Sequence, residues 1–92
     1  MENRTVEKEI LPREKLQKKG ATSLTNEELI ALILGSGSRN CSVFELSRHI
    51  SDYLSSVSSI PTVDSLRRIR GLGRVKASQI LACLELSSRY IL

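Results

Sequence analysis

The chain has 92 residues, of which 14 are basic and 10 are acidic, and its formal net charge is +4. This length supports one domain, or half of a larger one, and 40% apolar residues argue against a disordered chain. With two Tyr, one Phe and no Trp, the chain lacks the several exposed rings that a stacking platform for single-stranded bases needs. The longest apolar run, residues 29–34, is far too short to cross a membrane.

The N-terminal sequence does not look like an export signal, because charges are spread through it and it has no apolar segment. Cys41 and Cys83 belong to no CxxC pair, so we expect two reduced thiols rather than a disulfide. Both observations predict a cytoplasmic protein.

The first half of the chain predicts an arm followed by two helices. Residues 1–11 show no strong period, which is typical of a flexible N-terminal arm. Pro12 suits the first position of a short basic helix, and Gly20 suits its C-terminal cap. Thr25 and Glu28 form a capping box for a helix over residues 26–34. That helix is apolar on all sides from residue 29, so we expect it to be central and buried.

Three further helices are predicted in the second half. Ser42 and Glu45 repeat the capping box before a helix of about three turns. Thr62 would cap a short helix that runs through Ile69, and a long last helix covers residues 74–90. The inward stripe of this last helix is predicted to be Ala77, Ile80, Leu81, Leu84 and Ser88.

The overall prediction is an all-α fold of five short helices. No segment alternates between polar and apolar residues with a period of two, so we expect no sheet. Residues 12–92 would form a single domain with crossed helix packing.

The positive charge is concentrated in the second half of the chain. Residues 1–46 carry seven basic and seven acidic side chains, whereas residues 47–92 carry seven basic and three acidic ones. Half of the segment Arg67–Lys76 is basic, and no acid interrupts it. A smaller cluster over Arg13–Lys19 is opposed by Glu14, and a solvated helix face explains it equally well.

The most informative segment is residues 66–81, in which two glycines separate two apolar-patterned stretches. Leu66 and Ile69 would bury one side of a short helix, and Leu72 would fix the turn to the core. Gly71 and Gly73 permit backbone angles that other residues disfavour. The next helix begins at once, so its N–H groups and its positive dipole end face outward from the turn.

This pattern resembles a helix-hairpin-helix motif, which implies binding to the nucleic-acid backbone. By this resemblance, the amides near Gly71–Lys76 would meet a phosphate. Such contacts position a protein but read no base sequence, so the expected partner is duplex or junction DNA. The candidate phosphate-binding residues are Arg70, Gly71, Leu72, Gly73, Arg74, Lys76 and Ser78.

Two alternatives concern the glycine turns. The segment over residues 66–81 could be a tight αα-hairpin whose glycines serve the turn alone. An earlier segment, Gly35-Ser36-Gly37, resembles a degenerate first copy of the hairpin, and two copies would form a pseudo-twofold domain that grips both strands. We expect a structural role for this first loop, with phosphate contact by Ser38, Arg39 or Asn40 as the alternative.

The wider chain resembles the N-terminal domain of RadC-family bacterial proteins over about residues 12–90. The motifs that carry this resemblance are Pro12-Arg13-Glu14-Lys15-Leu16, Leu24-Thr25-Asn26-Glu27-Glu28-Leu29-Ile30-Ala31, Gly35-Ser36-Gly37-Ser38-Arg39, Gly71-Leu72-Gly73-Arg74-Val75-Lys76-Ala77 and Arg89-Tyr90. The family is traditionally labelled as DNA repair proteins. The resemblance also implies a larger C-terminal domain similar to JAB/MPN metallopeptidases, which binds zinc and has no counterpart in these 92 residues.

Catalysis by this chain is not expected. A zinc site needs three or four ligands within reach, and the chain offers one His and two scattered Cys. His49 falls between Glu45 and Asp52 on the predicted outer face of its helix, which favours a solvated side chain. No Walker-type motif and no Ser/His/Asp arrangement can be recognised, so we expect no metal and no cofactor.

The sequence therefore predicts a domain that binds DNA weakly through backbone phosphates. The alternative is a protein-interaction module of the same fold, which docks a partner or the family's metallopeptidase-like domain. The apolar residues over 81–84 and Leu86 on the last helix favour such a docking surface.

Overall fold

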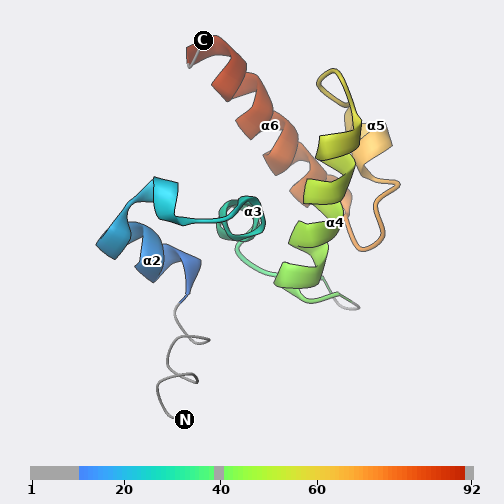
Figure 1. The fold of residues 1–92 in the computed structure, drawn as a ribbon. Coiled ribbons are helices and arrows are strands. Elements are labelled where there is room, and N and C mark those ends of the chain that lie inside the picture. The colour runs from blue at the N-terminus through green and yellow to red at the C-terminus, as the bar shows by residue number, and fades with distance from the viewer. Residues whose placement is uncertain (1–10, 39–40, 91–92) are drawn as a thin grey trace.

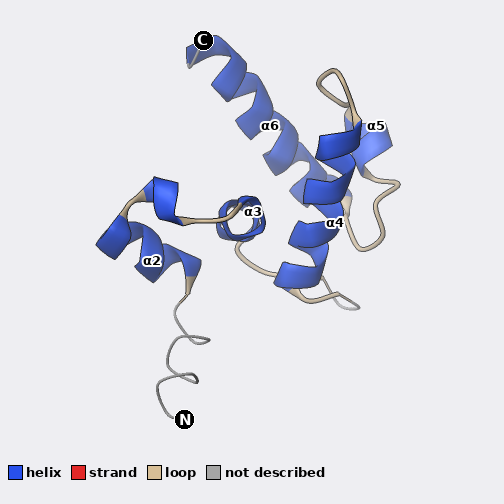
Figure 2. Ribbon diagram, in the orientation of Figure 1, coloured by secondary structure: helices blue, strands red, loops and turns tan. Residues whose placement is uncertain are grey.

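The structure is a computed structural model that describes residues 11–38 and 41–90. Within these ranges it contains five α-helices, one short 3₁₀ turn and no strand (Figures 1 and 2), which confirms the all-α prediction. The elements are α2 (Pro12–Lys19), η1 (Ala21–Ser23), α3 (Asn26–Leu34), α4 (Val43–Ser56), α5 (Val63–Leu66) and α6 (Arg74–Tyr90). The predicted arm lies outside the described residues except for Leu11, whose carbonyl accepts a hydrogen bond from the Lys15 N–H at 2.9 Å. No helix in the described ranges has the length and apolar character needed to cross a membrane.

Side-chain caps define the starts of three helices, at the three residues that the sequence predicts. The Thr25 hydroxyl accepts a hydrogen bond from the Glu28 N–H at 3.1 Å, and the Glu28 carboxylate accepts one from the Thr25 N–H at 2.8 Å. Ser42 and Glu45 make the same reciprocal pair at the start of α4. Thr62 pairs with the Ser65 N–H at the start of α5. Each cap satisfies backbone N–H groups that the helix itself cannot pair.

Helix α5 is shorter than predicted. It ends at Leu66 instead of continuing through Ile69. The chain then tightens into successive turns, in which the Ile69 N–H donates to the Leu66 carbonyl and the Leu72 N–H donates to the Ile69 carbonyl, both at 3.0 Å. Ile69 still packs against the core as a half-buried side chain, so the predicted inward side of this segment is correct.

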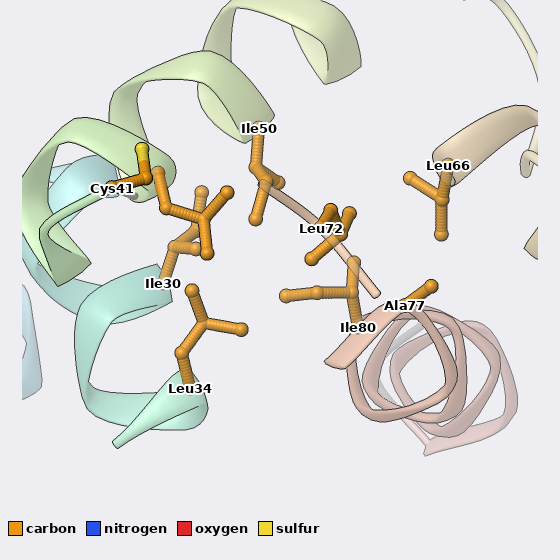
Figure 3. Packing of buried hydrophobic residues seen from close by; sticks show 9 residues of the cluster. Ile30, Leu34, Cys41, Ile50, Leu66, Leu72, Ala77 and Ile80 are labelled. Atoms are coloured by element: carbon orange, nitrogen blue, oxygen red, sulfur yellow. The ribbon is translucent and has the colours of Figure 1, made fainter. Parts of the chain in front are cut away.

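The core lies where α3, α4, α5 and α6 meet (Figure 3). Leu46, Ile50, Leu66 and Ala77 are completely buried, and Ile80 is nearly so. Around them pack the other buried members of the cluster, which are Ile30, Leu34, Cys41 and Leu72. The sequence patterns on α4 and α6 therefore converge on one apolar centre.

Two burial predictions are wrong in part. Helix α3 lies between α2 and the rest of the domain (Figure 1), but Ile33 is 38% exposed, so the helix is not buried on all sides. Ser88 was expected on the inward stripe of α6 and is exposed. Leu81 and Leu84 are half-buried, so the last turns of α6 extend beyond the core.

Helix α2 is attached to α3 by a partly buried ion pair. The Lys15 ammonium lies 3.1 Å from the Glu28 carboxylate, which also caps α3. The hydrogen bond from the Thr25 backbone, and then the nearby Lys15, lower the pKa of Glu28, whereas partial burial acts in the opposite direction. The charged form of Glu28 is therefore favoured by the fold.

Replacing Glu28 by Gln is expected to lower stability at neutral pH. A carboxylate whose pKa is lowered by folding stabilises the protein above its unfolded pKa, and this contribution is lost as the pH falls through the folded pKa. The difference in melting temperature between the wild type and Glu28→Gln should therefore shrink when thermal unfolding is followed from pH 7 down to about pH 3. A difference that stays constant over this range would show that Glu28 acts only through its shape.

Candidate nucleic-acid interface

The predicted hairpin exists and is fixed to the core from both sides. Leu66 is completely buried before the turn, and Leu72 is only 4% exposed within it. Gly71 has φ = +89°, a backbone conformation that side chains with a Cβ rarely adopt. The turn is therefore held by two apolar anchors and one glycine, as the sequence pattern predicts.

No side chain among the described residues caps the start of helix α6. The Gly73 carbonyl accepts the first helical hydrogen bond, from the Ala77 N–H at 3.0 Å, so Gly73 occupies the N-cap position. Its lack of a side chain distinguishes it from Thr25, Ser42 and Thr62, which cap the other helices. As in every α-helix, the first N–H groups of α6 have no partner within the helix. A Cβ on Gly73 would have nothing within 4 Å, so this end of α6 faces open space.

Basic residues precede this helix start in the sequence and occupy its first turn. Arg67, Arg68 and Arg74 are exposed, and the first acidic residue of α6 is Glu85, at the far end of the helix. Lys76 is half-buried, and its ammonium lies 3.5 Å from the Ser36 hydroxyl. Amides without a partner among the described residues, the positive end of the helix dipole and these cations together favour an anion.

Arg70 lies on another side of the hairpin, against α4. It lines a small polar cavity of about 200 Å³ together with Cys41, Glu45 and His49. His49 is half-buried, and its buried Nδ1 has no hydrogen-bond partner among the described residues. The prediction of a solvated His49 is therefore wrong, because the hairpin folds back over the side of α4 that the helix period alone assigns to solvent.

Cys41 lies directly beneath the hairpin. A Cβ on Gly71 would come within 3.1 Å of the Cys41 Cβ and 3.2 Å of the Ser38 hydroxyl, so a side chain here would crowd both residues as well as strain the positive φ. Burial, and then the nearby Glu45 carboxylate, raise the pKa of the Cys41 thiol. Cys41 and Cys83 are both free thiols.

The first glycine loop supports the hairpin. Gly35 has φ = +81°, close to the φ of Gly71, so the first glycine of each GxG segment adopts a positive φ. A Cβ on Gly37 would lie 2.6 Å from the Val43 nitrogen, which requires glycine at this close approach. The loop closes through the Ser38 N–H, which donates to the Cys41 carbonyl at 2.9 Å.

The two loops differ at the helix that follows each of them. Helix α4 starts six residues after Gly37 and is capped by Ser42, whereas α6 follows Gly73 immediately. Ser36, the middle residue of the first GxG segment, is exposed, whereas Leu72, the middle residue of the second, is buried. The first loop thus offers no uncapped helix start, which agrees with the expected structural role. Of the three alternative phosphate contacts, Ser38 has a buried hydroxyl with no hydrogen-bond partner among the described residues, and Arg39 and Asn40 lie outside the described residues.

Ser78 is placed one turn beyond the helix start. Its hydroxyl donates to the Arg74 carbonyl at 2.9 Å, so it would have to exchange this bond to donate to a phosphate. Gly73, Arg74 and Lys76 are the predicted residues that the structure gathers at one helix end. Among the described residues, no three His, Cys, Asp or Glu side chains are placed to hold a metal ion.

The hairpin predicts different responses at its two glycines. Gly71→Ala should destabilise the domain by roughly 1–3 kcal/mol, because it forces a side chain into a positive φ and against Cys41. Gly73→Ser should change stability by only a few tenths of a kcal/mol, because serine is a good N-cap and its Cβ meets nothing. Thermal unfolding of both variants checks this contrast, and equal destabilisation would contradict the described geometry.

Residues 4–78 match the sequence profile of a protein family that is described as UPF0758 N-terminal. This match covers most of the chain. The chain belongs to the UPF0758 family. The prediction that it resembles the N-terminal domain of RadC-family proteins is thereby confirmed at the level of the family.

Individual UPF0758 relatives agree with this assignment. A UPF0758 protein of Methanospirillum hungatei is 46% identical over 79 residues, which are 86% of this chain and 35% of the relative. Relatives from Aquifex aeolicus and Pasteurella multocida are 44% and 39% identical and match 92% and 99% of this chain. The chain spans only 35–42% of the length of these UPF0758 proteins. No solved structure matches the chain.

Proposed function

We propose that this UPF0758 domain binds duplex or junction DNA through backbone phosphates, without sequence specificity. The observation that carries the proposal is the start of α6 at Gly73, which no side chain of the described residues caps. Arg74 is exposed beside it, and the Lys76 ammonium lies 3.5 Å from the Ser36 hydroxyl. A phosphate placed there would accept hydrogen bonds from the amides of the first turn and meet two cations.

The arrangement also supports the expected lack of base readout. Sequence is read when a helix or strand enters a groove and its side chains reach base edges. Here the contact surface is a turn and one helix end, so it can approach only the phosphate backbone at the edge of a groove. In a longer relative such a module would hold the protein on DNA. This role fits the label of DNA repair that the RadC resemblance carries, and we propose it for the complete protein.

The test is a fluorescence-anisotropy titration of a labelled DNA duplex with the chain, repeated at several salt concentrations. If two to four phosphates are contacted, log affinity should fall against log salt with a slope of about −2 to −4. The double variant Arg74→Glu/Lys76→Glu should lose measurable binding at 100 mM salt while its circular dichroism stays unchanged.

The matched control reverses the same number of charges on α2. Lys18 and Lys19 are exposed, and Lys18→Glu/Lys19→Glu gives the same net charge as the hairpin variant. This control should retain most of the affinity. If both variants lose binding equally, net charge and not the hairpin is responsible, and the proposal fails. If the wild type does not bind even at low salt, the hairpin serves only the fold.

A further inference from the structure

Helix α6 has a second apolar face, which the core does not use. Successive residues of an α-helix are rotated by about 100°, so Ala77, Ile80 and Leu84 face the core from one side. The opposite side carries Val75, Gln79, Ala82, Leu86 and Tyr90. All five of these side chains are exposed, with Val75 at 75%, Leu86 at 57% and Tyr90 at 79%.

The C-terminal half of this face has no charged residue. Ala82, Leu86 and Tyr90 follow one another along it, and the half-buried Cys83 borders it. The nearest charges are Glu85 and Arg89, which pair with each other at 2.9 Å. Arg89 borders the face, because it lies about 20° around the helix from Ala82. This end of α6 extends away from the other helices (Figure 1), and every residue from Glu85 to Tyr90 is exposed. A solvated helix face normally carries polar residues instead.

We propose that Ala82, Leu86 and Tyr90, which we call the α6 outer stripe, dock the C-terminal part that UPF0758 relatives carry after the segment matched by this chain. The matching segment is the N-terminal 35–42% of those relatives. The stripe therefore lies on the last described helix of this chain, near the end of the segment that the remaining, larger part follows in the relatives. This inference does not depend on the proposed phosphate binding.

The small size of the stripe favours this occupant over a second copy of the chain. A stable dimer between free proteins buries about 800 Å² on each partner, which three or four side chains do not supply. A domain that follows in the same chain is held near the stripe at an effective concentration of about millimolar. At such a concentration, a contact built on one aliphatic and one aromatic anchor can persist although free partners would not maintain it.

Docking at this end would leave the hairpin accessible. Gly73 and Leu86 are separated by thirteen residues of helix, which is about 20 Å at 1.5 Å per residue. The same helix would then carry a phosphate contact at its N-terminus and a domain contact near its C-terminus. It would act as a spacer that fixes the distance between DNA and the C-terminal part of the protein.

Hydrogen exchange followed by mass spectrometry tests the proposal. The 92-residue chain is compared with a fusion in which the C-terminal part of the Pasteurella multocida relative follows Tyr90. Amides of residues 83–90 should exchange at least tenfold more slowly in the fusion. Leu86→Glu should remove this protection, whereas Ser87→Glu, which adds the same charge one position away on the flank, should retain it.

Three results would overturn the proposal. The first is equal exchange of residues 83–90 in the chain and in the fusion. The second is an equal response of the Leu86→Glu and Ser87→Glu fusions. The third is a dimer of the 92-residue chain in sedimentation that Leu86→Glu dissociates, because the stripe would then bind a second copy. If the fusion does not fold, exchange is measured on the full-length Pasteurella relative. A last helix that exchanges there as fast as in the isolated chain would likewise refute the docking.

Discussion

Replacing Gly73 by Asp is expected to weaken DNA binding by roughly 10- to 100-fold while leaving the domain at least as stable. Hydrogen bonds to a charged group contribute about 1.5–3 kcal/mol each, and 1.4 kcal/mol corresponds to a tenfold change in affinity. An Asp at this position would cap α6 with its own carboxylate and repel a phosphate. Because a Cβ on Gly73 meets nothing within 4 Å, the substitution should not disturb the hairpin.

The neutral variant Gly73→Asn separates the two effects of this change. Asn also caps a helix but adds no charge. If the amides of α6 hold the phosphate, Asn should weaken binding as well, although less than Asp. Full affinity of Gly73→Asn in the anisotropy titration would mean that Arg74 and Lys76 act without the helix amides. A lower melting temperature of Gly73→Asp would contradict the described N-cap position.

Replacing Leu46 by Ala is expected to cost about 2–5 kcal/mol of stability. Leu46 is completely buried at the centre of the core, so the substitution leaves a cavity among packed side chains. The total stability of a domain of this size is about 5–14 kcal/mol, so the variant should lie close to the unfolding threshold. Urea denaturation measures the difference directly.

The exposed Leu86 provides the control for this measurement. The same truncation, Leu86→Ala, removes a side chain that is 57% exposed and should change stability by less than about 0.5 kcal/mol. Similar losses at both positions would mean that the outer stripe of α6 is buried in solution. A small loss at Leu46 would mean that the core repacks around the missing side chain.

Features that depend on nearby residues could be predicted from the sequence. The capping boxes at Thr25 and Ser42, the glycine hairpin and the bounds of α6 all follow from residues within one or two turns of each other. The fold class follows from the same local patterns, because amphipathic helices without strands must pack on one another. The uncapped start of α6 was also predicted, since Gly73 directly precedes the last helix.

Features that depend on long-range contacts could not be predicted in this way. Gly71 packs against Cys41 and Ser38, and the period of α4 gives no sign that the hairpin would cover His49. The exposure of Ser88 and Ile33 has the same origin, since a helical period shows which face is apolar but not how far the partner helix extends. Its position in the sequence makes Arg70 a candidate phosphate contact like Arg74, but in the structure Arg70 lines a cavity against α4.

The attachment of α2 has a consequence for how the domain opens. Pro12 is the only buried residue of α2, and the helix is held by η1, α3 and the Lys15–Glu28 pair. Regions with few buried contacts unfold locally at a lower free-energy cost than the core. We therefore expect α2 to detach and return while α3–α6 stay folded, so a protease that cleaves only opened segments should cut at the lysines of α2 first. The domain would then behave as a stable four-helix unit with a detachable N-terminal helix.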